Sequence, residues 1–202
     1  MRVRKMSFVL AVVFGIVCIV SAMAEAGEPP KYVFFFIGDG MGTAQRIAAD
    51  AYLKASGEET SLLMNQFPNF GMTTTYANDR FITGSAASAT ALACGVKTNI
   101  GYVGVDPDLN SVETVAEKAK KKGMKVGIVS SVSIDHATPA CFYAHQPSRN
   151  MYYEIDMELA KSGFNYFGGG GFKDPEGEKS KNPQGNALEV AKENGYTIVS
   201  NK

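Results

Sequence analysis

The sequence lacks an apolar run long enough to span a membrane. The run at residues 8–20 has 13 residues, whereas a spanning helix needs roughly 20. Basic residues precede it, and small residues at 22–26 follow it, which is the layout of a cleavable secretory signal. We therefore expect residues 1–26 to be a signal peptide, residues 27–202 to form the mature domain, and the protein to be periplasmic or extracellular.

The sequence also lacks an excess of charge of either sign. It has 20 Lys and Arg residues against 20 Asp and Glu residues. Residues 1–26 hold three of the basic residues and one acidic residue, so 17 and 19 remain, a formal charge of −2. Surfaces that bind nucleic acid carry excess positive charge, so we expect no nucleic acid partner.

Cysteine is scarce, with three residues in the chain. Cys18 lies in the predicted signal peptide, which leaves Cys94 and Cys141. In an oxidising compartment these two could form a disulfide, or both could remain buried thiols. The sequence leaves both alternatives open.

From residue 31 onward, short β-rich runs alternate with helical stretches. The apolar run at 31–37 is typical of a buried strand. We expect further strands at 71–76, 125–130, leading into 168–171, and at 196–199. We expect helices at 43–55, 85–94, 111–122 with Ser111 as N-cap, 150–162 and after Asn186. This alternation predicts an α/β fold with a mostly parallel central sheet and helices on both faces.

Ligands of parallel sheets bind where strands end, so the turns after strands are the candidate sites. In the first, Asp39 lies in the glycine turn Ile37-Gly38-Asp39-Gly40-Met41-Gly42. Its carboxylate suits a hard metal cation. An ordinary tight turn and a degenerate dinucleotide loop are the alternatives.

The second candidate is Ser85, which lies between Gly84 and a run of small side chains. A nucleophile at a helix start faces unpaired N–H groups, which favour a phosphate. The alternative is that Ser85 only caps the helix.

The third candidate segment holds Asp135, His136 and Thr138, and Arg149 follows Thr138 by eleven residues. A carboxylate, an imidazole and a hydroxyl beside an arginine could form a metal and phosphate site, since guanidinium matches a phosphate edge through two hydrogen bonds. A lone histidine is more often structural, and we interpret His145 as such a hydrogen-bonded side chain.

Taken in order, these motifs resemble the alkaline phosphatase family. The matching segments are IGDGMG, GSAASATALACGVKTN with a downstream GVD, HATPACFYAH and SR. The resemblance covers essentially residues 31–202, and the combination is far more specific than any one motif.

The resemblance implies a role for each candidate residue in hydrolysis of phosphate monoesters. Asp39 would bridge a zinc and a magnesium ion, and Thr138 would serve the magnesium site, with His136 near it. Ser85 would be a zinc-bound nucleophile that forms a phosphoserine intermediate. Arg149 would hold two phosphate oxygens. The family also implies two zinc sites and a homodimer.

The sequence departs from the family pattern in three respects. Gly84 stands where many members have an Asp that orients the arginine. His136 stands where members have Asp or His, which leaves the third metal open. The family's other zinc ligands lie in a C-terminal half that this sequence lacks, and two histidines cannot supply two zinc sites. We therefore expect a truncated sequence, with an unfinished sheet edge after 196–199 and little activity on its own.

Two other classes of function remain open. One is a phosphodiesterase or sulfatase of the same superfamily, whose sites also combine an Asp turn with a hydroxyl nucleophile. The other is a non-catalytic module that binds phosphate or a nucleotide without cleaving a bond.

Overall fold

The computed structural model describes residues 30–58 and 61–200. The predicted signal peptide therefore lies outside the described residues. The chain divides between Gly38 and Asp39 into two compact units. All helices and strands given below belong to the second unit, which begins at Asp39.

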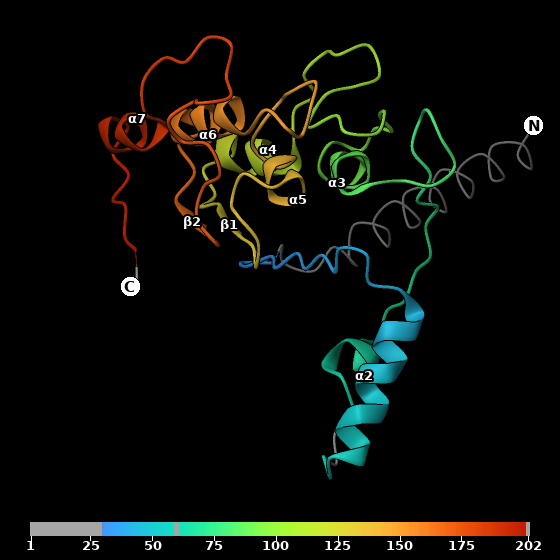
Figure 1. Ribbon diagram of the computed structural model, residues 1–202. Helices are drawn as coiled ribbons and strands as arrows, with labels where there is room; N and C mark the ends of the chain where they lie inside the picture. Colours follow the sequence, from blue (N-terminus) through green and yellow to red (C-terminus); the bar gives the residue numbers. More distant parts are fainter. Residues whose placement is uncertain (1–29, 59–60, 201–202) are drawn as a thin grey trace, which may run out of the picture. The chain divides into compact units, whose positions relative to one another are not determined.

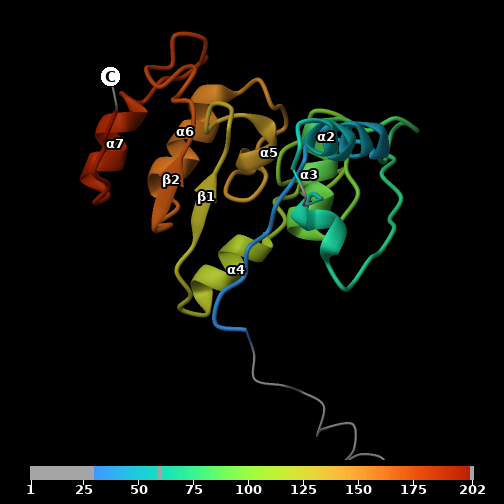
Figure 2. The ribbon, with the colours of Figure 1, turned by 90° about the horizontal axis from the view of Figure 1, so that it is seen from below.

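Two short parallel strands form the sheet within the described residues. Strand β1 is Gly127–Val129 and β2 is Tyr166–Gly168, with Ile128 opposite Phe167. They lie side by side in Figures 1 and 2, with helix α6 beside them. The predicted strands at 125–130 and before 168–171 are thus confirmed, with shorter bounds.

The five predicted helices are present, and two short helices that were not predicted, η1 and α5, accompany them within the described residues. They are α2 Thr43–Ala55, the 3-10 helix η1 Leu63–Gln66, α3 Ser85–Cys94, α4 Val115–Lys121, α5 Ala137–Ala140, α6 Tyr152–Lys161 and α7 Ala187–Glu193. Helix α6 packs against α7, and α3 contacts both α4 and α5. Within the described residues, no helix combines the length and apolar character of a membrane span.

Small side chains allow α3 to pack closely against its neighbours. Its residues Ala86, Ala87, Ala89 and Ala93 are buried. The helix ends at Gly95, whose φ of 75° is a left-handed conformation that glycine adopts without steric cost. A hydrophobic cluster lies between α6 and α7, where Tyr153, Met157 and Ala187 pack together.

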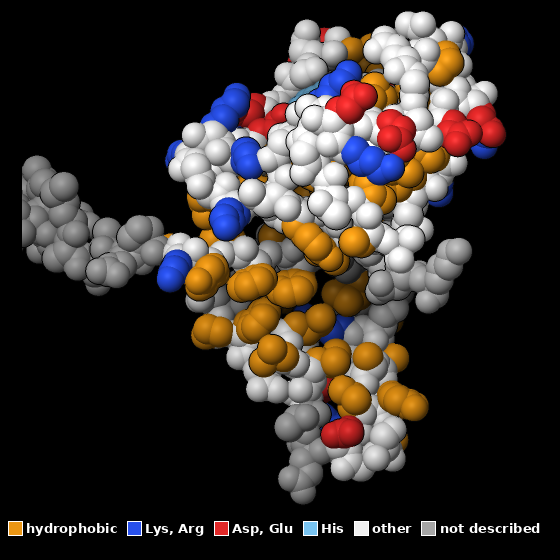
Figure 3. All heavy atoms as spheres, turned by 90° about the vertical axis from the view of Figure 1, so that its left-hand side faces the viewer, with side chains coloured by type: hydrophobic (Ala, Val, Ile, Leu, Met, Phe, Trp, Pro, Cys, Tyr) orange, Lys and Arg blue, Asp and Glu red, His pale blue; other side chains and the backbone are white. Residues whose placement is uncertain are grey.

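Three predicted strands are wrong. Segments 31–37, 71–76 and 196–199 have extended or irregular backbone without strand pairing. Their side chains are largely exposed, for example Phe36 at 86% and Met72 at 91%. Figure 3 shows one face on which exposed hydrophobic side chains gather. Apolar runs favour strands, but a strand forms only where a partner supplies hydrogen bonds.

The predicted N-cap of α4 is also wrong. Thr114, not Ser111, caps this helix, because its side chain accepts a hydrogen bond from the backbone N–H of Glu117 at 3.0 Å. The Glu117 carboxylate accepts in return from the N–H of Thr114 at 2.7 Å. Reciprocal bonds between an N-cap threonine and a glutamate three residues later form a capping box.

Replacing this cap should destabilise the fold. Thr114 is fully buried, and its hydroxyl also donates to the carbonyl oxygen of Phe142 at 2.9 Å. We expect Thr114→Ala to lower the free energy of unfolding by about 1–2 kcal/mol. Urea denaturation measures this change. Thr114→Ser keeps the hydroxyl and should recover most of it, and an unchanged midpoint for Thr114→Ala would contradict the cap.

Candidate functional site

The site begins where β1 ends. Beyond β1, the N–H of Ser130 donates to Gly168 O at 2.9 Å, and that of Ile134 donates to Gly171 O at 2.9 Å. The glycine run approaches this segment closely, since a Cβ on Gly169 would lie 3.0 Å from the carbonyl oxygen of Val132. The chain after the strand is therefore held against the second strand's end, and it leads directly into α5.

Asp39 accepts hydrogen bonds from two hydroxyl groups. Ser85 Oγ donates to Asp39 Oδ1 at 3.2 Å, and Thr138 Oγ1 donates to Asp39 Oδ2 at 2.8 Å. These residues are 46 and 99 positions from Asp39 in the sequence. The structure thus brings two of the other four candidate residues to the Asp39 carboxylate.

Ser85 is the first residue of α3. Gly84 is the N-cap, with an extended backbone at φ −132° and ψ 169° and no side chain to accept from the helix. The alternative that Ser85 is itself the N-cap is therefore wrong. The first N–H groups of a helix have no partner within it, so the Ser85 hydroxyl lies at the electropositive end of α3.

The other two candidates, His136 and Arg149, contact each other. Arg149 Nη2 donates to His136 Nε2 at 3.0 Å. Burial and, next, the positive charge of Arg149 lower the pKa of His136 below its usual value. The imidazole is therefore neutral at physiological pH and can accept this hydrogen bond. His136 Nδ1 is buried and has no hydrogen-bond partner among the described residues.

The start of α5 links the Asp39–Ser85–Thr138 contacts to the His136–Arg149 pair. His136 is the N-cap of α5, and Thr138 lies two residues later on the same helix. Asp39 is close enough to His136 for its charge to oppose the lowering of the histidine pKa. All five candidate residues therefore surround one region, at the carboxyl end of β1 and the N-terminus of α3.

Gly84 leaves space beside the serine. A Cβ at this position would meet only Ile100 Cδ1, at 3.6 Å, which is an ordinary van der Waals contact. Glycine is therefore not required there by packing. The structure gives Arg149 a different side-chain partner, His136, so the arginine is oriented without a carboxylate at position 84.

The oxygen atoms around Asp39 suit part of a metal's coordination sphere. One carboxylate and two hydroxyl groups are ligands that hard cations such as Mg²⁺ accept. Within residues 30–58 and 61–200, no three His, Cys, Asp or Glu side chains are grouped so as to hold a metal ion. The donor set thus fits a metal ion, but these residues alone do not complete a site.

The two cysteines do not pair. Cys94 and Cys141 are both free thiols. Burial raises the pKa of Cys94 to about 11 and that of Cys141 to about 12. Cys141 Sγ donates to the carbonyl oxygen of Ala86 at 3.3 Å, so it helps to hold α5 against α3. The alternative of two unpaired thiols is confirmed.

Sequence reasoning included Asp135 in the third candidate segment but missed Asp156, a second buried carboxylate whose pKa responds to the charge of Asp135. Asp135 is fully buried beside His136, and its Oδ2 accepts from the N–H of Lys173 at 2.6 Å. Asp156 is 1% exposed, and neither of its oxygens has a hydrogen-bond partner in the described structure. Burial, then the charges of Asp135 and Asp174, raise its pKa to about 9. Asp156 belongs to no motif, so no sequence signal could have identified it.

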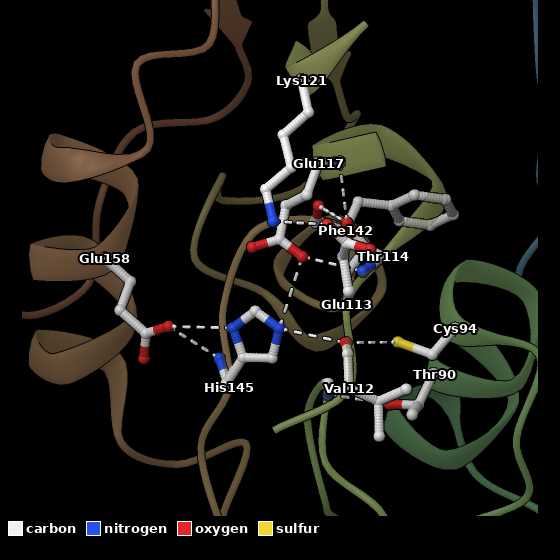
Figure 4. A network of polar contacts seen from close by, with 11 residues as sticks. Thr90, Cys94, Val112, Glu113, Thr114, Glu117, Lys121, Phe142, His145 and Glu158 are labelled. Carbon is white, nitrogen blue, oxygen red and sulfur yellow. Dashed lines mark hydrogen bonds and ion pairs between the residues drawn. The ribbon is translucent and has the colours of Figure 1, made fainter. Parts of the chain in front are cut away.

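His145 has the hydrogen-bonded environment that was predicted. Its Nδ1 lies 3.4 Å from Glu158 Oε2, and its Nε2 lies 3.2 Å from the carbonyl oxygen of Val112. Figure 4 shows the ring between these groups. The hydrogen bond with Glu158 raises the pKa of His145 above its usual value.

Comparisons with known proteins agree with these motifs. The family model described as Alkaline phosphatase matches residues 30–166. Alkaline phosphatase 4 of Drosophila melanogaster is 40% identical over 141 residues, which are 64% of this chain and 23% of the fly protein. The mouse tissue-nonspecific isozyme is 39% identical over 141 residues, covering 63% of this chain and 27% of its own length. The chain thus spans about a quarter of these curated relatives.

Solved structures give the same result. Alkaline phosphatase from the Antarctic bacterium TAB5 aligns with a TM-score of 0.72 at 34% identity, over 82% of this chain and 46% of that one. A histidine-to-glutamate mutant of that protein, with Mg bound in its M3 site, aligns equally well. The Thermus thermophilus enzyme aligns with a TM-score of 0.72 at 27% identity, over 81% and 35%. The predicted α/β fold is confirmed, and the chain belongs to the alkaline phosphatase family.

Proposed function

We propose that the protein hydrolyses phosphate monoesters, with Ser85 as the nucleophile. The observation that supports this most strongly is the position of Ser85, at the start of α3 and hydrogen-bonded to Asp39. Helix N-termini favour anions because their N–H groups point outward. A phosphate that approached Ser85 would meet these groups on one side.

Ser85 Oγ would form a bond to phosphorus while the bond to the ester oxygen breaks. The leaving oxygen departs with the electron pair and takes up a proton, and a phosphoserine remains. A water molecule then attacks the phosphoserine, releasing inorganic phosphate and restoring the Ser85 hydroxyl. Bound metal ions would supply positive charge and lower the pKa of the attacking hydroxyl.

Arg149 would bind two oxygens of the phosphate. Its guanidinium can donate several hydrogen bonds in one plane, and one of them already goes to His136 at 3.0 Å. His136 therefore fixes the plane in which the remaining N–H groups point. A neutral His136 serves this role without adding a competing positive charge.

Asp39 and Thr138, with the Ser85 oxygen, would hold metal through their oxygen atoms. We propose a zinc ion at Asp39 and Ser85, a magnesium ion at Asp39 and Thr138 with His136 close by, and a second zinc. The described residues supply only part of these sites, so further ligands must join them. The described segment alone is accordingly expected to be nearly inactive.

Export and dimerisation complete the proposal. The segment 1–26 would direct the protein to the periplasm or the extracellular space. A homodimer would be the assembled form. Export is tested by the N-terminus of the secreted protein, and dimerisation by its mass in solution.

Substrate class is tested on the purified full-length gene product. We expect hydrolysis of nitrophenyl phosphate, with bis-nitrophenyl phosphate and nitrophenyl sulfate cleaved at least about a hundred-fold more slowly. A chelator should abolish the activity, and zinc with magnesium should restore it. Preference for the diester or the sulfate would replace the proposal by a related esterase, and tight phosphate binding without turnover would replace it by a binding module.

A further inference from the structure

His145 lies in a setting that neither the fold alone nor the proposed chemistry accounts for. Each of its two ring nitrogens faces acceptors only. Nδ1 faces the Glu158 carboxylate from α6, while Nε2 faces the Val112 carbonyl oxygen at 3.2 Å and the Glu117 carboxylate from α4 at 3.5 Å. Figure 4 shows the ring with Glu158 on one side and Val112 and Glu117 on the other.

This arrangement matches a doubly protonated ring. A neutral imidazole has one N–H, so one nitrogen lone pair would point at an acceptor oxygen. An imidazolium donates from both nitrogens and satisfies both sides. The neighbouring groups are consistent with this protonation state. Lys121 forms its ion pair with Glu113. The Val112 carbonyl oxygen acts as an acceptor for the Cys94 thiol as well, at 3.4 Å.

The segment that begins at His145 carries Arg149. The backbone N–H of His145 donates to Glu158 Oε2 at 2.8 Å, and the Gln146 side-chain amide donates to Glu158 Oε1. Gln146 and Val103 exchange backbone hydrogen bonds at 2.8 and 3.0 Å, and the N–H of Arg149 donates to Gly101 O at 2.7 Å. The backbone from 145 to 149 is thus held between α6 and residues 101–103.

Val112 links His145 to the segment around Gly104. Its N–H donates to Gly104 O at 3.0 Å, while its carbonyl oxygen faces His145. A Cβ on Gly104 would lie 2.1 Å from the carbonyl oxygen of Ala144, so these two segments touch through their backbones. A displacement of His145 therefore also displaces the backbone segment 145–149, which positions Arg149.

We propose that His145 is a positioning residue for Arg149 and thereby sets the affinity for phosphate. It acts as an imidazolium, held by the Glu158 carboxylate at Nδ1 and by the Val112 carbonyl oxygen and the Glu117 carboxylate at Nε2. The inference rests on the proposed function, in which Arg149 binds the phosphate. Affinity is greatest while the ring is charged and falls as pH rises through the folded-state pKa of His145. Because that pKa is raised, the midpoint of the decline lies above the ordinary pKa of a histidine.

The test compares the full-length protein with three variants, using inorganic phosphate as the probe. We expect His145→Gln to weaken phosphate binding about ten-fold or more, because a small displacement of a positioned group already costs up to about a hundred-fold. The KM for a monoester should rise with it, while kcat changes little. Glu158→Gln should shift the pH midpoint of phosphate affinity downward, because it removes the negative charge that favours the charged ring.

Glu113→Gln is the matched control. It removes a neighbouring carboxylate that contacts Lys121 and not His145, so its pH midpoint should equal that of the unmodified protein. Phosphate and bound metals titrate too, but comparison of variants at each pH cancels their contribution. A merely structural His145 would lower the melting temperature without moving the midpoint, and that outcome would overturn the proposal.

Amide hydrogen exchange tests the positioning role of His145 without relying on phosphate binding or on activity. In His145→Gln, the N–H groups of Gln146 and Arg149 should exchange faster than in the unmodified protein, while those of α3 stay unchanged. If the unmodified protein binds no phosphate, the proposed function fails, and exchange at Arg149 still decides whether His145 holds it. Unchanged exchange at both amides would refute the positioning role.

Discussion

Replacing Ser85 by alanine should lower kcat/KM for a phosphate monoester by about a thousand-fold or more, because loss of a nucleophile removes the covalent route. The Ser85 hydroxyl is half-buried at the first position of α3 and donates to Asp39 at 3.2 Å. Alanine fits this position in a helix of small residues, so the fold should be retained. Steady-state kinetics on the full-length gene product measure the loss.

Ser88→Ala is the control for this experiment. Ser88 lies on the same helix one turn later, and its hydroxyl donates to the carbonyl oxygen of Gly84 at 3.0 Å. The same serine-to-alanine change there leaves the site's hydroxyl in place, and activity should remain within a few-fold. A second measurement is phosphate incorporation after acid quenching, which should label the Ser85 peptide and vanish in Ser85→Ala. Undiminished turnover by Ser85→Ala would refute the mechanism.

The second large effect is expected from Asp39→Asn. The amide has nearly the same shape, and its oxygen and nitrogen can still pair with the hydroxyl groups of Ser85 and Thr138, so this change isolates the negative charge. We expect activity to fall by about a hundred-fold or more, the upper range for groups that support a metal site. Added zinc and magnesium should recover little of it.

The matched control is Asp106→Asn. Asp106 accepts hydrogen bonds within its own loop, from the N–H groups of Asp108 and Asn110 at 2.9 and 2.8 Å. Its replacement should leave the kinetics and the metal requirement unchanged. Metal content measured on the purified proteins separates the two variants, since only Asp39→Asn should lose metal. Full activity with normal metal content in Asp39→Asn would contradict the role of the carboxylate.

Local structure could be predicted where the chain itself supplies the hydrogen bonds. The predicted bounds 43–55 and 85–94 agree with α2 and α3, because a helix pairs its backbone internally and glycines bracket the second one. The strand predicted at 31–37 is not formed, because an apolar run alone does not supply the pairing partner that a strand needs. The N-cap of α4 could have been predicted from the sequence. Thr114 has a glutamate three residues later, Glu117, as a capping box requires, whereas Ser111 has no glutamate or glutamine at that spacing.

The candidate site was predictable only in part. The resemblance to a family selected Asp39, Ser85, His136, Thr138 and Arg149, and the structure places them around one region. The contact of Arg149 with His136 could not be derived, because no spacing rule relates a guanidinium to an imidazole thirteen residues earlier. Asp156 was missed since a charged residue on a helix ordinarily faces water, whereas this one is buried.

Gly104 also bears on how this protein tolerates change. Its φ of 61° and the 2.1 Å approach that any Cβ would make to the Ala144 carbonyl leave no room for another residue. A methyl group there would push the backbone of Ala144 and the ring of His145 away from residue 104, and with them the start of the segment that leads to Arg149. A library that varies this loop should therefore keep Gly104 fixed, together with the buried Val103 and Val105 on either side of it.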